Sequence, residues 1–539
     1  MKSLLNNISL IKKHLFWLIA LSTITRGLLA WILDLGSNEA YYWTYGSYPE
    51  LSHIDHPPMI GWFIQLFTVN LALDGELFLR LASIVTGSIN TWLVFVIGRR
   101  VRNERTGLYA AFIYTASAYC SLFTGTFITP DTPQSLFLLL SVYFLHEGLT
   151  VKYELCQETK ILCRIAILLA GIFIGLSMLS KYSSVFIWAG AIAYMVSSNR
   201  KILKDITLYI SFSISLLFLL PVILWNIDNN FISFAFQSSR MPVSNLTPDL
   251  LSFIKSLGWI LLYNNPLSIS IMAFALFSFR RDKYLKPEQY KLFLSLSLPF
   301  LIFFIGISLF TESRPNWSAP GFYPLMFIAA AYLDNKSKIV SNSEEGIIPL
   351  PVSNSITLML LMMLIVFVHH FSGFLSFDYK KEAHKEIGEG DITLNYFGWR
   401  TLSKEFEKIK ADDVSAGLMP EKCFILSDNW AHASLMDFYV ASPSSSIVKT
   451  IGNLEDTRKY AWVTGKLGTF RYGESAYFIE SSIEPKRADE IGKRYFSDTH
   501  KARSVYIKKL GKPVLRFDIY RLKNMTRIPE RELCSYTKY

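Results

Sequence analysis

The sequence predicts an α-helical polytopic membrane protein with about eleven spans and a small extracytoplasmic α/β domain at its C-terminal end. Of its 539 residues, 51% are hydrophobic and 18% are charged, which is too apolar for a soluble protein of this length. Runs of about 20 apolar residues recur as far as residue 374, and beyond it the sequence is mixed and polar. We therefore divide the chain into a membrane domain, residues 1–374, and an extracytoplasmic domain, residues 375–539.

Nine apolar runs are each expected to form one span, and a tenth is long enough to form two. The tenth run, Ile165–Val196, is interrupted by Ser-Lys-Tyr-Ser-Ser, so we expect two short helices that turn at Lys181. The first run lacks a convincing cleavage site and is expected to remain as a span. The nine single runs are Leu15–Leu33, Leu77–Gly98, Leu108–Ile128, Gln134–Leu149, Ile206–Trp225, Leu251–Phe279, Leu292–Phe310, Trp317–Leu333 and Ile356–Phe374.

Basic residues cluster in alternate connections between these runs, at residues 12–13, 99–105, 152–164, 200–204, 280–286 and 336–338. The positive-inside rule places these connections and the N-terminus in the cytoplasm. An odd number of spans then sends the C-terminal domain outward, where Cys423 and Cys534 are able to form a disulfide. The net charge of +11 therefore reflects orientation in the bilayer rather than nucleic-acid binding. The five cysteines show no spacing typical of a zinc or redox site.

The C-terminal part of the chain alternates between two kinds of pattern. Residues 399–410 and 432–441 have the apolar spacing of amphipathic helices. Residues 423–428, 475–481, 504–510 and 514–522 read as strands, because apolar and β-branched residues dominate them. Together these patterns predict a small α/β domain.

The first outer connection, Gly36–Met59, is unusually rich in chemistry for a loop between two apolar runs. It contains Glu39, Asp55 and two histidines, and Pro57-Pro58 should shape the chain sharply after Asp55. Its five aromatic residues are of the type found at membrane interfaces. We expect short amphipathic helices that face lipid headgroups and point their acids inward; an aromatic belt with solvated acids is the alternative.

Two further charges lie in predicted outer connections. Asp131 stands between two prolines at a membrane face, where an acid is costly unless it has a partner or a use. Lys181 lies in the middle of an apolar hairpin, on the side where basic residues are otherwise scarce. Each has an ordinary explanation, since Asp131 can cap a helix and Lys181 can extend toward headgroups. Together with the acids of the first loop they predict a site for a substrate that carries phosphate and must lose a proton.

Six motifs in order resemble the bacterial polytopic glycosyltransferases of the GT-C superfamily, the dolichyl-phosphate-mannose protein mannosyltransferase-like proteins that include the lipid A aminoarabinose transferases. The motifs are NEAYYWTY, HIDHPPMIGW, TPDTPQ, LSKYSSV, WNIDNNFISFAFQSSR and RPNWSAPGFYP, and the resemblance covers residues 15–335. It implies the GT-C fold and a sugar donor linked to polyprenyl phosphate. It also implies a site on the outer face of a bacterial inner membrane and inversion of the anomeric centre.

The resemblance also assigns roles to residues. Related enzymes usually carry Asp-Glu at the start of the first outer loop, whereas this chain has Asn38-Glu39. Because asparagine does not accept a proton at neutral pH, the base is Glu39, Asp55 or Asp131, or else the protein binds its lipid-linked sugar without turnover. We favour Glu39, with Asn38 holding a hydroxyl of the acceptor or sugar. Phosphate is expected to bind Lys181, Arg240 and Arg314. Substrate contacts are expected from Tyr41, Tyr42, His53, His56, Tyr182, Gln237, Asn316 and Trp317.

Metal and cofactor chemistry are not expected. His53 and His56 flank Asp55, but the pattern lacks the helical spacing of a metal site. A flippase for lipid-linked sugars would need charges within the spans, and the sequence offers few besides Arg26 and Arg80 near span ends. The acceptor is expected to be an envelope molecule: lipid A or lipopolysaccharide, another glycan, or a protein.

Overall fold

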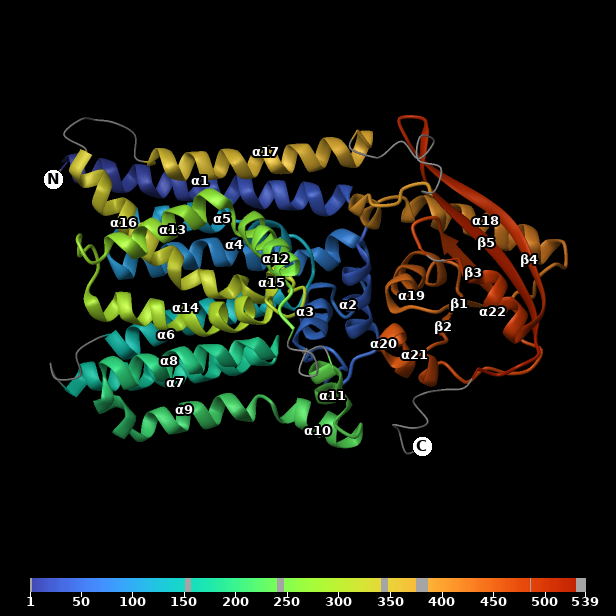
Figure 1. Ribbon diagram of the computed structural model, residues 1–539, viewed down its shortest axis with the longest axis horizontal. Helices are drawn as coiled ribbons and strands as arrows, with labels where there is room; N and C mark the ends of the chain where they lie inside the picture. Colours follow the sequence, from blue (N-terminus) through green and yellow to red (C-terminus); the bar gives the residue numbers. More distant parts are fainter. Residues whose placement is uncertain are drawn as a thin grey trace.

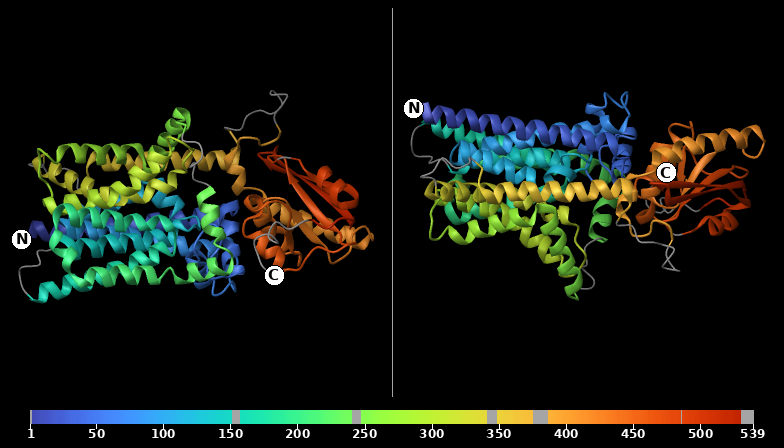
Figure 2. Two further views of the ribbon diagram at one scale, coloured as in Figure 1. Left: turned by 60° about the horizontal axis from the view of Figure 1, so that its bottom comes forward. Right: turned by 90° about the horizontal axis from the view of Figure 1, so that it is seen from above.

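The computed structural model describes residues 2–150, 157–239, 247–340, 348–374, 386–484 and 486–529. It has two parts, a long helical bundle and an α/β domain that sits at one end of the bundle (Figure 1). The N-terminus lies at the far end of the bundle from the α/β domain, and two further views agree (Figure 2).

Most of the bundle is formed by helices that run along its long axis. In the described part of the chain, five helices are long and apolar enough to cross a membrane, and two bent pairs raise this number to seven. This supports a membrane protein with several spans, while the number eleven stays a prediction. The bundle helices are α1 (Lys2–Ile32), α4 (Glu76–Val101), α5 (Glu104–Ala116), α6 (Asp131–Thr150), α7 (Gln157–Met178), α8 (Phe186–Ser198), α9 (Ile206–Leu217), α10 (Leu220–Asp228), α12 (Leu250–Asn264), α13 (Pro266–Ser278), α14 (Pro287–Ile307), α16 (Tyr323–Val340) and α17 (Leu350–Ser372).

The predicted break at Lys181 is confirmed, because α7 ends at Met178 and α8 begins at Phe186 after a short 3-10 turn. Several other runs are not the single straight helices that their composition predicts. The run Ile206–Trp225, for example, bends by 42° between α9 and α10. The run Leu108–Ile128 leaves the α-helical form after Ala116 and continues into a π-helical turn over Tyr119–Phe123.

The run Leu251–Phe279 bends by 95° between α12 and α13. The bend lies at Asn265, whose φ of 66° is left-handed and whose successor, Pro266, has no N–H to donate. The Asn265 side-chain amide instead donates to the backbone oxygens of Ala116 and Ser355, at 3.1 and 2.8 Å. These bonds give the bend polar partners inside the bundle, which an apolar pattern alone does not reveal.

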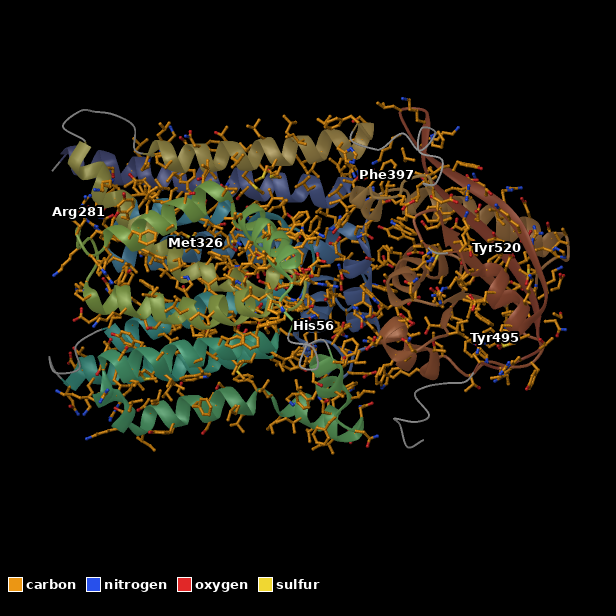
Figure 3. All side chains as sticks on the ribbon, viewed as in Figure 1. His56, Arg281, Met326, Phe397, Tyr495 and Tyr520 are labelled. Atoms are coloured by element: carbon orange, nitrogen blue, oxygen red, sulfur yellow. The ribbon has the colours of Figure 1, made fainter. Side chains whose placement is uncertain are left out.

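Four short helices cap the end of the bundle that faces the α/β domain: α2 (Ser37–Ser47), α3 (Met59–Phe67), α11 (Ile232–Ser239) and α15 (Pro315–Ser318). His56 lies at this end, whereas Arg281, from a basic connection, lies at the opposite end (Figure 3). The acid-bearing and basic connections are therefore separated along the bundle, as the positive-inside reading requires.

The C-terminal sheet has the strand order β2-β1-β3-β5-β4. β1 is parallel to β2 and β3, and β5 is antiparallel to β3 and β4. The helices and strands predicted in this region are confirmed. The strands are β1 (Phe424–Ser427), β2 (Val448–Thr450), β3 (Ala476–Ser481), β4 (Phe496–Lys509) and β5 (Lys512–Met525), and the helices are α18 (Trp399–Ser415), α19 (Trp430–Met436), α20 (Leu454–Thr457), α21 (Tyr460–Lys466) and α22 (Ala488–Tyr495).

One apolar core joins the two parts, because residues of α2 pack with residues of α19. Tyr41 and Tyr45 are fully buried, and the rings of Tyr41 and Trp430 lie 4.9 Å apart. The expectation that the aromatic residues of the first loop face lipid headgroups is therefore wrong. The α/β domain covers them, and burial against protein replaces burial at the membrane interface.

A buried acid in the α/β domain makes its stability depend on pH. Burial raises the pKa of Asp437 to about 7, although the hydrogen bond from the Tyr460 hydroxyl, at 3.0 Å, lowers it. A carboxyl whose folded pKa exceeds its unfolded value costs stability when ionised, so this cost is complete above about pH 7 and disappears toward pH 4. We expect Asp437→Asn to raise the melting temperature at pH 8 more than at pH 5, in detergent-solubilised protein. The exposed-acid variant Asp412→Asn is the control, and equal shifts at both pH values would contradict the assignment.

Candidate active site

Two carboxylates of the candidate site, Asp55 and Asp131, are buried. Asp55 directly precedes His56, which lies at the capped end of the bundle (Figure 3), and Asp131 contacts Asn316 of α15, one of the capping helices. Asp55 and Asp131 are 1% and 3% exposed, so both must be satisfied by protein groups. Asp55 comes from the loop between α2 and α3, and Asp131 begins α6. Their different partners give the two acids different chemistry.

Asp131 and Lys181 form a buried ion pair, with Lys181 Nζ 2.8 Å from Asp131 Oδ1. The Tyr119 hydroxyl donates to the same oxygen at 2.9 Å, and the Asn316 amide donates to Oδ2 at 3.3 Å. Lys181 is thus directed to an acid rather than to headgroups. Three segments far apart in the sequence meet here because each ends or turns at this end of the bundle.

Asp55 is held mainly by tyrosine hydroxyls. Tyr41 and Tyr45 both donate to its Oδ1, the former at 3.1 Å. The guanidinium of Arg458 is more distant, with Nη1 3.8 Å from Asp55 Oδ2. The Gln237 amide donates to the Asp55 backbone oxygen at 2.6 Å, so Gln237 positions the loop.

The pKa of the Tyr42 hydroxyl depends on both acids. Burial raises the pKa of its hydroxyl, and the charges of Asp55 and Asp131 raise it further, while Arg458 and Arg314 oppose them. The His56 ring lies against Tyr42, with centroids 5.8 Å apart. Tyr42 therefore lies in the electrostatic field of both acids of the candidate site.

Glu39 has a different place from the one predicted. Arg80 Nε and Nη2 donate to its two carboxylate oxygens, at 2.8 and 2.6 Å, and both side chains are buried. The Gly36 and Ile128 backbone N–H groups also donate to Glu39, at 3.1 and 3.2 Å. With its charge neutralised and both oxygens occupied, Glu39 holds the start of α2. These contacts occupy both carboxylate oxygens, and the predicted role of Glu39 as the base stays a prediction.

Asn38 remains close to the site. It is half-buried in the first turn of α2, three, four and seven residues before Tyr41, Tyr42 and Tyr45. These spacings place the four side chains on one face of the helix. The Asn38 position is therefore compatible with its predicted contact to a substrate hydroxyl, which stays a prediction.

His53 and Tyr182, which are also predicted to contact the substrate, pack against other side chains of the protein. The His53 ring stacks on Tyr45, with centroids 3.7 Å apart, and burial together with Lys459, Lys466 and His56 lowers its pKa. Tyr182 packs beside Met59 and Leu179.

Trp317 contacts Phe304, with ring centroids 6.0 Å apart, and Arg314 is exposed at the start of α15. Arg240 and Cys534 lie outside the described residues, so their predicted roles stay predictions. Within the described ranges, no group of three or more His, Cys, Asp or Glu side chains is placed to hold a metal ion.

Sequence reasoning missed two cations from the α/β domain. The Arg458 guanidinium lies over the Trp430 ring at 4.0 Å and beside Asp55. Lys459 is buried, and its Nζ donates to the backbone oxygens of Thr44 and Tyr48, at 2.9 and 2.6 Å. In the sequence both belong to a polar stretch that looks like solvated surface, so no local signal distinguishes them.

Residues 55–225 match the family model of dolichyl-phosphate-mannose-protein mannosyltransferase. The structure is similar to ArnT from Cupriavidus metallidurans bound to undecaprenyl phosphate, with a TM-score of 0.64 and 12% identity over 94% of this chain and 97% of ArnT. The apo form of the same ArnT gives a TM-score of 0.60 with the same identity and coverage. The chain has the GT-C glycosyltransferase fold. No curated protein matches the sequence at a significant level.

The resemblance inferred from the six motifs is thus confirmed. The segment that matches the family model contains Asp55, Asp131 and Lys181, whereas Glu39 and the α/β domain lie outside it. The family model thus covers part of the N-terminal half of the chain, whereas the structural similarity to ArnT covers 94% of it.

Because Glu39 forms a buried ion pair with Arg80, a substitution at Glu39 can test whether its role is structural or catalytic. Glu39→Gln would leave the buried Arg80 guanidinium without a counter-charge, which typically costs about 3–5 kcal/mol. We expect a large loss of thermal stability in detergent, while the protein that remains folded retains its function. Glu405→Gln, which breaks an exposed pair with Lys408, is the control and should leave stability nearly unchanged. Wild-type stability combined with loss of transfer would instead make Glu39 the base.

Proposed function

We propose that the protein is an inverting glycosyltransferase that moves a sugar from a polyprenyl-phosphate-linked donor to an envelope acceptor. The observation that carries this proposal is that Asp55 and the Asp131–Lys181 pair belong to adjoining loops at the end of an apolar bundle, where the Met59 N–H donates to the Leu179 backbone oxygen at 3.4 Å. A donor whose tail stays in the bilayer presents its phosphate at such an end. We place this end at the outer face of a bacterial inner membrane, with the N-terminus in the cytoplasm and the C-terminus in the periplasm.

Lys181 and Arg314 are the proposed phosphate-binding cations among the described residues. The Lys181 ammonium has three N–H groups, so it can keep its contact with Asp131 and still donate to a phosphate oxygen. A fixed cation stabilises the charge that develops on the leaving phosphate. Polyprenyl phosphate is already a good leaving group, so the site does not need an acid to protonate it. The structural similarity to ArnT, which binds undecaprenyl phosphate, supports this choice of donor.

Asp55 is the proposed base. Of the three acids, Glu39 is paired with Arg80 at 2.6 Å and Asp131 with Lys181 at 2.8 Å. The cation beside Asp55, Arg458, is more distant, at 3.8 Å from Oδ2. The acceptor hydroxyl attacks the anomeric carbon and its proton passes to Asp55. The bond between that carbon and the phosphate oxygen breaks, and polyprenyl phosphate leaves. A single displacement inverts the anomeric centre.

A non-catalytic binder of lipid-linked sugars is the second candidate. It is favoured by Asn38, which stands where the related enzymes usually have an aspartate. Asp55→Asn separates the two functions, because only an enzyme needs a proton acceptor.

We expect Asp55→Asn to lower kcat by about 10²–10⁴-fold with little change in the KM for the donor. The measurement is transfer of radiolabelled sugar from a panel of undecaprenyl-phosphate-linked sugars to envelope extracts. Asp74→Asn, an exposed acid in the connection between α3 and α4, is the matched control. Unchanged turnover in Asp55→Asn would rule out Asp55 as the base, and no turnover in the wild type would favour the binder.

We expect Lys181→Gln to weaken binding of undecaprenyl phosphate by about tenfold or more, because a charge-assisted contact to phosphate is lost. Binding is measured with protein in nanodiscs, and Lys255→Gln, an exposed lysine of α12, is the control. Equal affinity in the two variants would show that Lys181 does not bind the phosphate.

A further inference from the structure

A polar pocket lies in the α/β domain, beyond the carboxyl ends of β1 and β3. Its volume is about 160 Å³, which is suited to one small polar group rather than to a lipid chain. In open α/β sheets this edge is where ligands usually bind. The charged and titratable lining residues are Asp428, His432, Asp456, Glu480, Glu484 and Arg487.

The pocket contains a buried donor that is not used within the protein. His432 Nδ1 contacts Glu484 Oε2 at 2.9 Å, and the side chain is 5% exposed. Its other ring nitrogen, Nε2, is buried and finds no hydrogen-bond partner among the described residues. Burial lowers the pKa of His432, but the charges of Glu484, Asp428 and Glu480 outweigh this and raise it. His432 lines the pocket, and its protonated ring carries at Nε2 an N–H group that has no partner among the described residues.

The remaining polar groups limit what can occupy the pocket. Four acids against one histidine and one arginine repel an anion such as phosphate. The described residues offer no cluster suited to a metal ion. Glu480 Oε1 accepts from the Arg487 and Ala488 N–H groups, each at 2.5 Å, so this acid is held in place. Fixed carboxylates that accept from hydroxyls, opposite an imidazole that donates, fit a small polyhydroxyl ring.

The pocket adjoins the candidate active site. Asp456 lies two residues before Arg458, whose guanidinium stacks on Trp430 at 4.0 Å and lies 3.8 Å from Asp55 Oδ2. Asn429, which lines the pocket, directly precedes Trp430. The Arg458–Trp430 stack thus contacts Asp55 through Arg458, and both of its members lie within two residues of a residue that lines the pocket.

We propose that this pocket binds a sugar unit of the acceptor, next to the unit whose hydroxyl reacts. The proposal rests on the proposed glycosyltransferase function and narrows the acceptor to a carbohydrate-bearing molecule. Asp456 is exposed at the mouth of the pocket and is the substrate contact that can be removed with least disturbance to folding.

The test measures sugar binding separately from transfer. Saturation-transfer difference NMR is recorded on the full-length protein in nanodiscs with glucose, galactose, mannose and glucosamine, and with methylammonium as a cation probe. Four proteins are compared: wild type, Asp456→Ala, the neighbouring exposed-acid control Glu455→Ala, and Asp55→Asn. We expect Asp456→Ala to lose most of the sugar signal, and the other three to keep it. In transfer assays we expect Asp456→Ala to raise the acceptor KM about tenfold and to leave the donor KM unchanged.

Three results would overturn the proposal: no sugar signal in the wild type, equal signals in Asp456→Ala and Glu455→Ala, or binding of methylammonium without binding of any sugar. A fourth result would distinguish the two proposals. If the wild type shows no transfer activity but binds sugar in a way that depends on Asp456, the proposed enzymatic function is contradicted and the pocket is supported as a sugar site.

Discussion

The buried contact between Arg80 and Glu39 is the interaction on which the rest of the site depends. Besides Glu39, the Arg80 guanidinium donates to the backbone oxygens of Ala30, Leu33 and Asp34, where α1 ends. One side chain of α4 therefore joins the end of α1 to the start of α2. Because an unpaired arginine inside an apolar bundle is costly, this junction has essentially one arrangement. It directs the tyrosine face of α2 toward Asp55.

The same junction anchors the α/β domain. The Asp34 carboxylate accepts from the Trp399 N–H at 2.9 Å and pairs with Arg400 at 3.1 Å, and burial raises its pKa to about 6. On the other side of α2, Lys459 binds two backbone oxygens of the first loop. The domain thus contacts both ends of α2 and excludes water from Asp55. It forms a wall of the candidate site rather than a separate appendage.

Three acids near the site acquire three different roles from their partners. Glu39 faces an arginine and backbone donors, which suits a structural anion. Asp131 faces Lys181, the lysine proposed to bind phosphate. Asp55 faces two tyrosine hydroxyls and a more distant arginine, which leaves it the most available of the three. This division follows the general rule that environment, rather than residue type, assigns acid and base roles. In the proposed mechanism, Asp55 supplies the carboxylate for proton transfer in a chain that has Asn38 in the first loop.

The sequence by itself determined the membrane class, the helical bundle, the break at Lys181, four of the five strands of the C-terminal sheet and the GT-C resemblance; the short strand β2 was not predicted. These depend on local composition, periodicity and motif order, which are readable along the chain. It also singled out Asp55, Asp131 and Lys181, because charges beside apolar runs stand out. Only the tertiary structure showed that Glu39 forms an ion pair with Arg80 and that the chain bends sharply at Asn265. It also showed that Arg458 and Lys459 of the α/β domain contact the first loop. Each of these involves partners separated by dozens to hundreds of residues, and a linear pattern carries no information on which distant group satisfies a buried charge.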